Sequence, residues 1–203
     1  MNSNQARSNI LRKLQSRHNT PGLQKTTELT AIQYSSVGEF SENISKNGAL
    51  ITFADYEKSA LQAAKQLCED NDWLQPPVVS PALQARCRKL HLWSVENRDA
   101  RPAGTVAITQ AYCGIADTGT LLCLSSAANP TSLNFLPEHH IVLLDKARIV
   151  AQKKDAWRML RNESIASPRA INMISGPSRT ADIEQTIQLG AHGPRSLTVI
   201  IVG

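Results

Sequence analysis

Three segments of the sequence combine residue types that could bind or transform a small molecule. Residues 114–120 read Gly-Ile-Ala-Asp-Thr-Gly-Thr and offer a carboxylate and two hydroxyl groups beside a glycine. Residues 175–184 read Ser-Gly-Pro-Ser-Arg-Thr-Ala-Asp-Ile-Glu, and residues 190–194 read Gly-Ala-His-Gly-Pro. Such groups suit hydrogen bonding to a polar ligand, anion binding and proton transfer, respectively.

The Asp-Thr-Gly tripeptide of the first segment allows three interpretations. Aspartic proteases use it to hold a catalytic carboxylate, but they need two such aspartates in an all-β fold, and this chain has a single copy. Alternatively, Asp117, Thr118 and Thr120 line a pocket and direct their polar groups at a small ligand. In the structural interpretation, the Asp117 carboxylate accepts hydrogen bonds from backbone N–H groups of a turn in which Gly119 adopts a positive φ.

The second segment follows an apolar stretch and predicts the end of a strand, a glycine turn and the start of a helix. Ser178 and Thr180 are suited to cap that helix, and Asp182 and Glu184 lie where negative charge complements the helix dipole. The functional alternative is an anion site formed by free N–H groups and hydroxyls. The two acidic side chains disfavour such a site, and Arg179 partly offsets their charge.

Histidines provide further acid–base candidates. Glycines flank His192, whose imidazole is suited to act as a general acid or base near neutral pH, although hydrogen bonding within its own loop is the simpler role. His139 and His140 precede an apolar run, and neighbouring residues of a strand face opposite sides of a sheet. We therefore expect these two rings to share no metal ion, and at most one of them to point into a pocket.

Apolar runs alternate with amphipathic segments along most of the chain. The strands predicted from them span residues 49–53, 76–80, 91–95, 104–111, 119–124, 141–144, 170–174 and 197–202, and the predicted helices begin near Asp55, cover 81–90 and 153–160, and begin at Thr180. This alternation predicts an α/β fold with a mostly parallel sheet and helices on both faces. Because such folds bind ligands beyond the carboxyl ends of strands, we expect the loops around Asp117 and Ser178 to meet at one edge of the sheet and form a shared cavity.

The amino-terminal segment differs from the rest of the chain in charge. Residues 1–28 hold five lysines and arginines against one glutamate, which gives them +4 of the formal net charge of +5. We expect residues 1–28 to form a basic amphipathic helical arm and connector, and residues 29–203 to form one α/β domain. No basic stripe interleaved with aromatic residues follows the arm, so nucleic-acid binding is disfavoured.

The sequence also predicts where the protein works and what it lacks. No signal-peptide pattern and no stretch of about 18 apolar residues occurs, which predicts a cytoplasmic protein without a membrane span. The cysteines at positions 68, 87, 113 and 123 match no spacing typical of zinc, haem or iron–sulfur ligands. We expect buried, reduced thiols, no metal site and no cofactor in this chain.

Three segments together resemble the LUD-domain family, in particular its lactate-utilisation protein C members. They are GIADTGTLL at 114–122, LPEHHIVLL at 136–144 and GPSRTADIEQTIQLGAHGP at 176–194. The resemblance is strong over about residues 104–203, and ARSNILRKLQ at 6–15 is similar to the family's amino-terminal helix.

The resemblance implies a fold like that of the CoA-transferase and ribose-5-phosphate isomerase superfamily. It also implies a subunit that supports oxidation of L-lactate to pyruvate with iron–sulfur partner proteins, in which the clusters are expected. Its pocket would hold a small carboxylate or organise the partners, and no catalytic residue is assigned. The family motifs map onto the candidate ligand-binding residues Asp117, Thr118, Gly119, Thr120, Ser178, Thr180, Asp182, His192 and Gly193.

Two other functions fit parts of the sequence. An independent enzyme of the isomerase or CoA-transferase kind would use Asp117 or His192 as its acid–base group, although no glutamate in these motifs occupies an evident nucleophile position. A binding module built on the basic arm would retain DNA in a salt-sensitive manner through residues 1–28.

Overall fold

A computed structural model describes Arg7, Arg12 and residues 31–73, 75–93, 105–165, 168–181, 187–189 and 193–203. The chain divides into two compact units, Met1–Ala31 and Ile32–Gly203, and the layers and cavities described here belong to the second. The predicted helix at 5–15 and the basic arm lie outside the described residues, apart from Arg7 and Arg12, which are helical.

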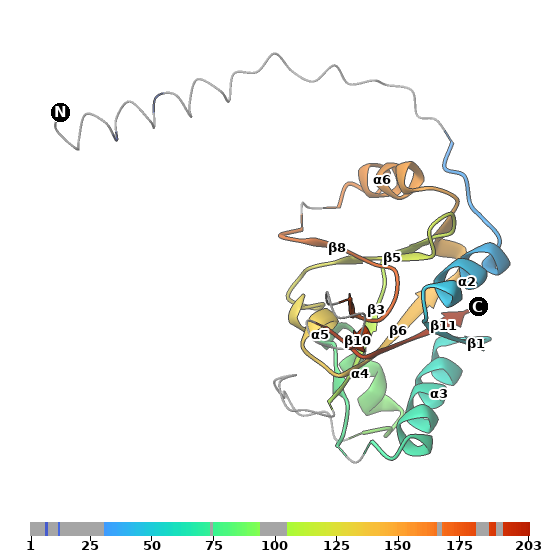
Figure 1. Ribbon diagram of the computed structural model, residues 1–203, viewed down its shortest axis with the longest axis vertical. Coiled ribbons are helices and arrows are strands. Elements are labelled where there is room, and N and C mark those ends of the chain that lie inside the picture. Colours follow the sequence, from blue (N-terminus) through green and yellow to red (C-terminus); the bar gives the residue numbers. More distant parts are fainter. Residues whose placement is uncertain are drawn as a thin grey trace. The chain divides into compact units, whose positions relative to one another are not determined.

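The centre of the second unit is a five-stranded parallel sheet in the order β1-β11-β6-β3-β2 (Figure 1). Its strands are β1 (Leu50–Ala54), β11 (Ser196–Val202), β6 (His139–Asp145), β3 (Val106–Gln110) and β2 (Val78–Val79). The middle strands β11 and β6 are almost continuously apolar and buried, as is typical of a parallel sheet covered on both faces. The predicted α/β fold with a mostly parallel sheet is therefore confirmed.

Helices α3 (Glu57–Asp70) and α4 (Pro81–Lys89) cover one face of this sheet. Helix α3 presents Ala60, Leu61 and Ala64 along one stripe because these positions recur at helical spacing. This stripe packs with Leu83 and Cys87 of α4 against the odd-numbered residues of β6. Pro81 stands at the first turn of α4, where its missing N–H costs no hydrogen bond.

The opposite face is covered by α2 (Val37–Lys46) and by a second sheet. That sheet has four strands in the order β7-β4-β5-β8: β7 (Ile149–Val150), β4 (Cys113–Ile115), β5 (Thr120–Leu124) and β8 (Ile171–Ile174). Phe40 and Ile44 of α2 pack with residues of β5 against the even-numbered residues of β6. Gly114 lies at this contact, and a Cβ there would come within 2.9 Å of Leu144, so the close approach excludes a side chain.

Helix α6 (Lys153–Asn162) covers the outer face of the second sheet through Ala156 and Met159. The unit is therefore layered as helices, parallel sheet, smaller sheet and helix, with α3 and α6 at opposite ends of the stack (Figure 1). Helix α2 falls in a stretch for which the sequence predicted no element.

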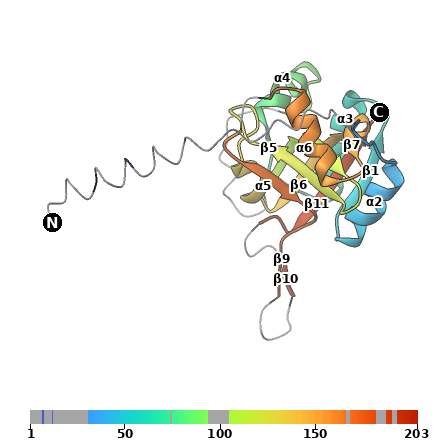
Figure 2. The ribbon, with the colours of Figure 1, turned by 90° about the horizontal axis from the view of Figure 1, so that it is seen from above.

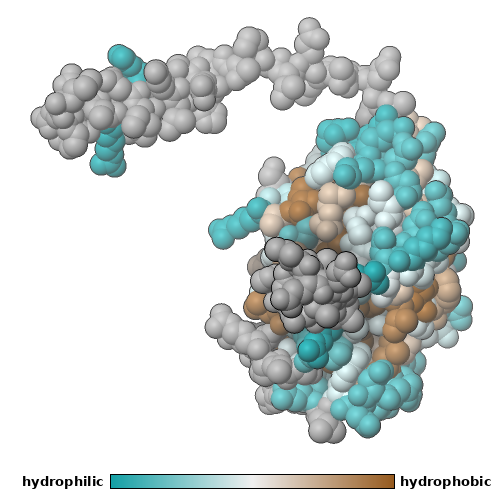
Figure 3. All heavy atoms as spheres, in the orientation of Figure 1, coloured by the Kyte–Doolittle hydropathy of each residue, from teal (hydrophilic) through white to brown (hydrophobic). Residues whose placement is uncertain are grey.

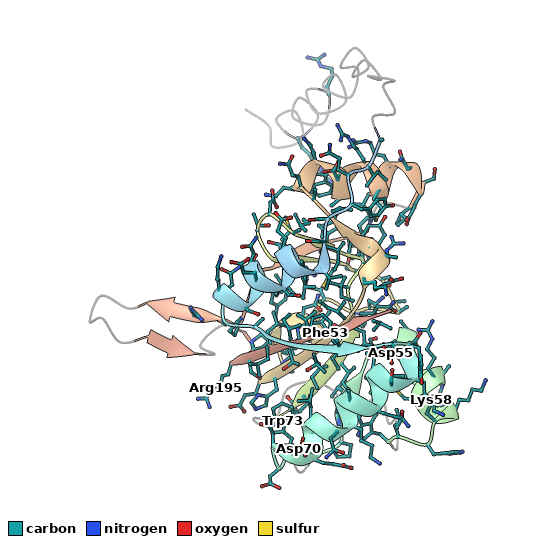
Figure 4. The ribbon with its side chains drawn as sticks, turned by 90° about the vertical axis from the view of Figure 1, so that its right-hand side faces the viewer. Phe53, Asp55, Lys58, Asp70, Trp73 and Arg195 are labelled. Carbon is teal, nitrogen blue, oxygen red and sulfur yellow. The ribbon has the colours of Figure 1, made fainter. Side chains whose placement is uncertain are left out.

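Strand β1 is an edge of the parallel sheet and carries exposed apolar side chains. Leu50 is 64% exposed and Phe53 is 62% exposed. The surface over this edge is hydrophobic in Figure 3, and Phe53 is labelled on the strand in Figure 4. The outer side of β1 pairs with no strand of the described chain.

The predicted strand at 91–95 is wrong for its described part, His91–Trp93. These residues end α4: the His91 N–H donates to the Arg88 carbonyl and the Leu92 N–H donates to the Cys87 carbonyl, while His91 has a φ of 51°. This is the bonding pattern of a Schellman motif. Leu92 and Trp93 are apolar because they pack beside α3 and α4 and not because they extend the sheet.

The predicted helix beginning at Thr180 is also wrong. Residues Arg179–Ala181 form strand β9, which pairs antiparallel with β10 (Ile187–Leu189), and the hairpin projects from the body in Figure 2. Ser178 and Thr180 therefore cap no helix at this point. The anion site at a helix N-terminus, expected as an alternative, loses its structural basis.

All four cysteines are free and buried, as the sequence predicted. Burial raises the pKa of Cys68 and Cys87 to about 11 and that of Cys113 and Cys123 to about 12, because a thiolate is poorly solvated in an apolar core. Among the described helices, none is long and apolar enough to cross a membrane.

Gly119 provides a test of the turn between β4 and β5, which packs against α2. It has a φ of 58°, and a Cβ there would collide with the backbone of Ile44, so we expect Gly119→Ala to lower the free energy of unfolding by more than about 2 kcal/mol. Gly38 is the matched control, because it is exposed in α2 with open space around it, and Gly38→Ala should raise stability by about 0.5–1 kcal/mol. Urea unfolding of both variants measures the difference, and equal stabilities would contradict this account of the turn.

Candidate functional site

The two motif loops lie side by side, as the sequence predicted, but no residue of 114–120 lines either cavity described below, so the loops do not form the shared cavity that we expected. Strands β5 and β8 pair antiparallel with Leu121 opposite Ile174, which brings the start of one strand to the end of the other. A chain of hydroxyl groups joins the loops: Thr118 Oγ1 lies 2.8 Å from Thr120 Oγ1, which lies 2.7 Å from Ser175 Oγ. Side chains from distant parts of the sequence therefore form one polar cluster.

Helix α2 holds the first loop in place. Asn43 Nδ2 donates to the Ala116 carbonyl at 2.8 Å, and Asn47 Nδ2 donates to the Thr118 carbonyl at 3.2 Å. The Gly119 N–H donates to the Ala116 carbonyl and closes the turn, and Gly119 has the positive φ that the sequence predicted. The loop is thus fixed through its backbone, and its Thr118 and Thr120 hydroxyls are already engaged in the chain that ends on Ser175.

Asp117 does not occupy a catalytic environment in this arrangement. Its side chain is exposed, lines neither of the cavities described below and takes no hydrogen bond from a described residue, whereas its N–H donates to the Ala151 carbonyl. The expected turn exists, but it is closed by backbone groups and not by bonds to the Asp117 carboxylate. The protease interpretation fails because the fold is α/β and the sequence holds one copy of the motif.

A cavity of about 230 Å³ lies beside the second loop, and we call it the Ser178 cavity. It is lined by Asn134, Phe135, His140, Met173, Ile174, Ser175, Gly176, Ser178, Gly193, Pro194 and Leu197. Two of the predicted ligand-binding residues, Ser178 and Gly193, belong to it. The hydroxyl chain from Thr118 and Thr120 ends at its wall, on Ser175.

Four parts of the fold build the cavity. Strands β6 and β11 supply His140 and Leu197, strand β8 supplies its last residues, and the short helix α5 (Ser132–Phe135) supplies Asn134. The Ser178 N–H donates to the Pro194 carbonyl at 2.8 Å and ties the loop after β8 to the one before β11. Gly193 lies against Ser178, since a Cβ there would be 3.2 Å from the Ser178 Cβ.

His140 is the most deeply buried polar residue of this cavity, and the sequence analysis did not include it in the site. It is 1% exposed; its Nε2 lies 2.8 Å from Thr109 Oγ1, and its Nδ1 has no hydrogen-bond partner among the described residues. Burial lowers the pKa of His140 to about 3, so the ring is neutral at physiological pH. An unsatisfied buried polar atom of this kind costs about 1–3 kcal/mol.

His139 lies on the other face of the same strand. Its ring stacks on Trp73, which follows α3 (Figure 4), with 4.3 Å between ring centroids, and its Nδ1 lies 2.8 Å from Ser196 Oγ. One of the two neighbouring rings lines the cavity and the other does not, in agreement with the alternation expected for a strand. The sequence could not tell which ring it would be.

A second cavity, of about 560 Å³, lies beyond the carboxyl end of β3. Its lining includes Tyr112, Arg148 and Glu163, whose polar groups already bind one another. Arg148 Nη2 donates to both carboxylate oxygens of Glu163 at 2.9 and 3.0 Å, and the Tyr112 hydroxyl donates to Glu163 at 2.9 Å. Burial and the neighbouring carboxylate raise the pKa of Tyr112. None of the predicted site residues that the structure describes lines this cavity.

We expected the cavity beyond the carboxyl ends of the parallel strands, and this expectation was wrong for the Ser178 cavity. The Ser178 cavity lies at the amino ends of β6 and β11, since it contacts His140 and Leu197 near the start of each strand. The reason is that β8 runs in a second sheet, and its carboxyl end meets the amino ends of the parallel strands.

Three of the predicted ligand-binding residues are described only in part or not at all. Thr180 lies in β9, and Asp182 and His192 lie outside the described residues. Within the described part of the chain, no group of three or more histidine, cysteine, aspartate or glutamate side chains is arranged to hold a metal ion.

The layered sheets and the cavity beside them define an α/β protein with a candidate ligand site between its two sheets. Residues 37–202 match the model of the LUD domain, and the chain belongs to the LUD-domain family.

Among curated proteins, the chain is 36% identical over 118 residues to Uncharacterized protein NMB1437 of Neisseria meningitidis serogroup B, covering 57% of this chain and 48% of that protein. It is 34% identical over 119 residues to Lactate utilization protein C of Shouchella clausii, covering 55% and 51%. The chain thus spans about half the length of these relatives.

A solved structure supports the fold. The crystal structure of a DUF162 family protein from Deinococcus radiodurans is similar with a TM-score of 0.56 at 20% sequence identity, covering 82% of this chain and 95% of that one.

The buried His140 predicts how stability depends on pH. In the unfolded chain a histidine titrates near about pH 6.5, whereas in the folded chain its pKa is about 3. The unfolded state therefore binds a proton that the folded state does not, so acidification below about pH 6.5 lowers the free energy of unfolding, by on the order of 1 kcal/mol per pH unit. His140→Gln removes this contribution, and urea unfolding at about pH 7 and pH 5 should show a smaller loss than in the wild type. Equal losses in both proteins would contradict the burial of a neutral ring.

Proposed function

We propose that this chain takes part in lactate utilisation, as an accessory subunit that supports oxidation of L-lactate to pyruvate with iron–sulfur partner proteins. Membership of the LUD-domain family and similarity to proteins named Lactate utilization protein C support the proposal. The observation that carries it is the Ser178 cavity, which lies between the loop after β8 and the loop before β11 and whose lining includes uncharged hydrogen-bonding groups.

The composition of this cavity suits a small polar molecule. Its described lining contains no charged side chain; it combines Asn134, His140 and two serine hydroxyls with an apolar wall that includes Ile174 and Leu197. A few convergent polar groups on an apolar lining are typical of small-molecule sites. A three-carbon acid offers oxygen atoms to the polar groups and a methyl group to the apolar wall.

Oxidation of L-lactate to pyruvate releases two electrons and two protons, which must pass to an acceptor. The four cysteines of this chain are buried, and burial keeps their thiols protonated, so they are poorly suited to bind a cluster as thiolates. This favours partner proteins as the carriers of electrons. The exposed position of Asp117 gives no support to the alternative of an independent enzyme that uses it as an acid–base group.

A gene deletion tests this proposal directly. A strain of the source organism that lacks the gene should lose growth on L-lactate as carbon source and keep growth on glucose, and the intact gene should restore it. A tagged chain purified from lactate-grown cells should bring down iron–sulfur proteins, identified by mass spectrometry and by their visible absorption.

Cells grown on glucose serve as the control for the purification. Normal growth of the deletion strain on L-lactate, together with purification of the tagged chain without iron–sulfur partners, would refute the proposal.

A further inference from the structure

His140 has one ring nitrogen without a partner, in a cavity wall. The ring is 1% exposed, and its Nε2 lies 2.8 Å from the Thr109 hydroxyl. Nδ1 is therefore the ring nitrogen that is left to bind a molecule in the Ser178 cavity. Buried polar atoms in folded proteins are almost always hydrogen-bonded. A buried nitrogen that has no partner among the described residues, in a side chain that lines a cavity, therefore points to a ligand atom that completes it.

Thr109 allows His140 to act either as a donor or as an acceptor. A threonine hydroxyl both donates and accepts. When the Thr109 hydroxyl donates to Nε2, the proton of the neutral ring is on Nδ1, which then donates to a carbonyl oxygen. When Nε2–H donates to Thr109, Nδ1 is bare and accepts from a hydroxyl group. Rotation of the Thr109 hydroxyl, together with a shift of the ring proton between Nε2 and Nδ1, thus matches the ring to either kind of ligand oxygen.

The other polar groups of the cavity complete a site for a small acid. Asn134 is 7% exposed, lines the cavity and has no hydrogen-bond partner among the described residues, and the Ser178 hydroxyl also has none. An amide N–H and a hydroxyl are donors suited to a carboxylate. Ile174 and Leu197 provide the apolar surface beside them.

We propose that the Ser178 cavity binds small 2-hydroxy and 2-oxo monocarboxylates, with His140 Nδ1 bound to the oxygen on C2. Asn134 and Ser178 donate to the carboxylate, and the methyl group of the three-carbon acids packs on Ile174 and Leu197. The choice of L-lactate and pyruvate as ligands rests on the proposed function. The two acids differ in having a hydroxyl or a carbonyl at C2, which is the difference that the His140–Thr109 pair accommodates.

The ring resonances of His140 report the proposed contact. The purified full chain, labelled with ¹⁵N-histidine, is titrated with sodium L-lactate, sodium pyruvate and sodium propionate, which has the same carbon chain without an oxygen on C2. We expect lactate and pyruvate to shift the His140 nitrogens in opposite directions, because one donates to Nδ1 and the other accepts from it. Propionate should bind about tenfold or more weakly, since Nδ1 stays unpaired.

Two variants separate the role of Nδ1 from the fold. A glutamine amide can reach the Nε2 position, so His140→Gln keeps a partner for Thr109 and removes Nδ1, and its affinity for L-lactate should fall about tenfold or more. His139→Asn is the matched control, because asparagine mimics Nδ1 and keeps a partner for Ser196, and its affinity should be unchanged. If His140→Gln does not fold, Asn134→Leu, which removes the amide at similar size, should show the loss in its place.

The outcomes distinguish this inference from the proposed function. No shift of the His140 resonances by either acid, equal affinity for propionate and L-lactate, or unchanged affinity in the folded variants would each overturn it. Growth on L-lactate that depends on the gene while the purified chain binds neither acid would overturn the assignment of the cavity and leave the proposed function standing. Binding of both acids by a chain that is dispensable for growth on L-lactate would support the assignment of the cavity and overturn the proposed function.

Discussion

The pairing of β5 with β8 is the interaction on which the site depends. It joins segments that are about fifty residues apart through the register from Leu121–Ile174 to Leu124–Ile171. This pairing fixes the second sheet over the parallel sheet, ends the hydroxyl chain from Thr118 on Ser175 and encloses the space above β6 and β11. Without it, the motif loops would lose the strand pairing that joins them, and the cavity beside His140 would lose the wall that β8 supplies.

Burial gives His140 its chemical character. Under the second sheet the ring loses solvation, which disfavours its charged form and leaves a neutral imidazole with one satisfied nitrogen. Arg148, in the larger cavity, is in the opposite state: it is charged and its guanidinium is bound by Glu163. The two cavities therefore differ in the groups that are left for a ligand. In the larger one, Arg148 and Glu163 bind each other, whereas in the smaller one His140 Nδ1 has no partner among the described residues.

Apolar periodicity was sufficient to predict most of the layers. The runs at 141–144 and 197–202 are the central strands, and the stripe along Ala60 and Ala64 is the face that α3 buries. The meeting of the Asp117 and Ser178 loops was also predicted. These features depend on local pattern and on the general rule that alternating strands and helices build a covered sheet.

The errors arose where tertiary pairing decides the structure. Arg179–Ala181 forms a hairpin strand because it pairs with Ile187–Leu189, although its residue types also suit a helix start. The place of the cavity at the amino ends of the strands follows from the direction of β8, which no local pattern encodes. For the same reason, alternation could show that His139 and His140 face apart but not which face the second sheet would cover.

The four buried thiols can report local unfolding of the layers that cover them. Cys123 lies between the two sheets, Cys68 and Cys87 lie under α3 and α4, and Cys113 lies beneath α6. A protonated, shielded thiol reacts slowly with alkylating reagents, so each cysteine becomes reactive only when its own layer separates. The relative labelling rates of the four positions would thus show the order in which the layers come apart, without introducing any probe.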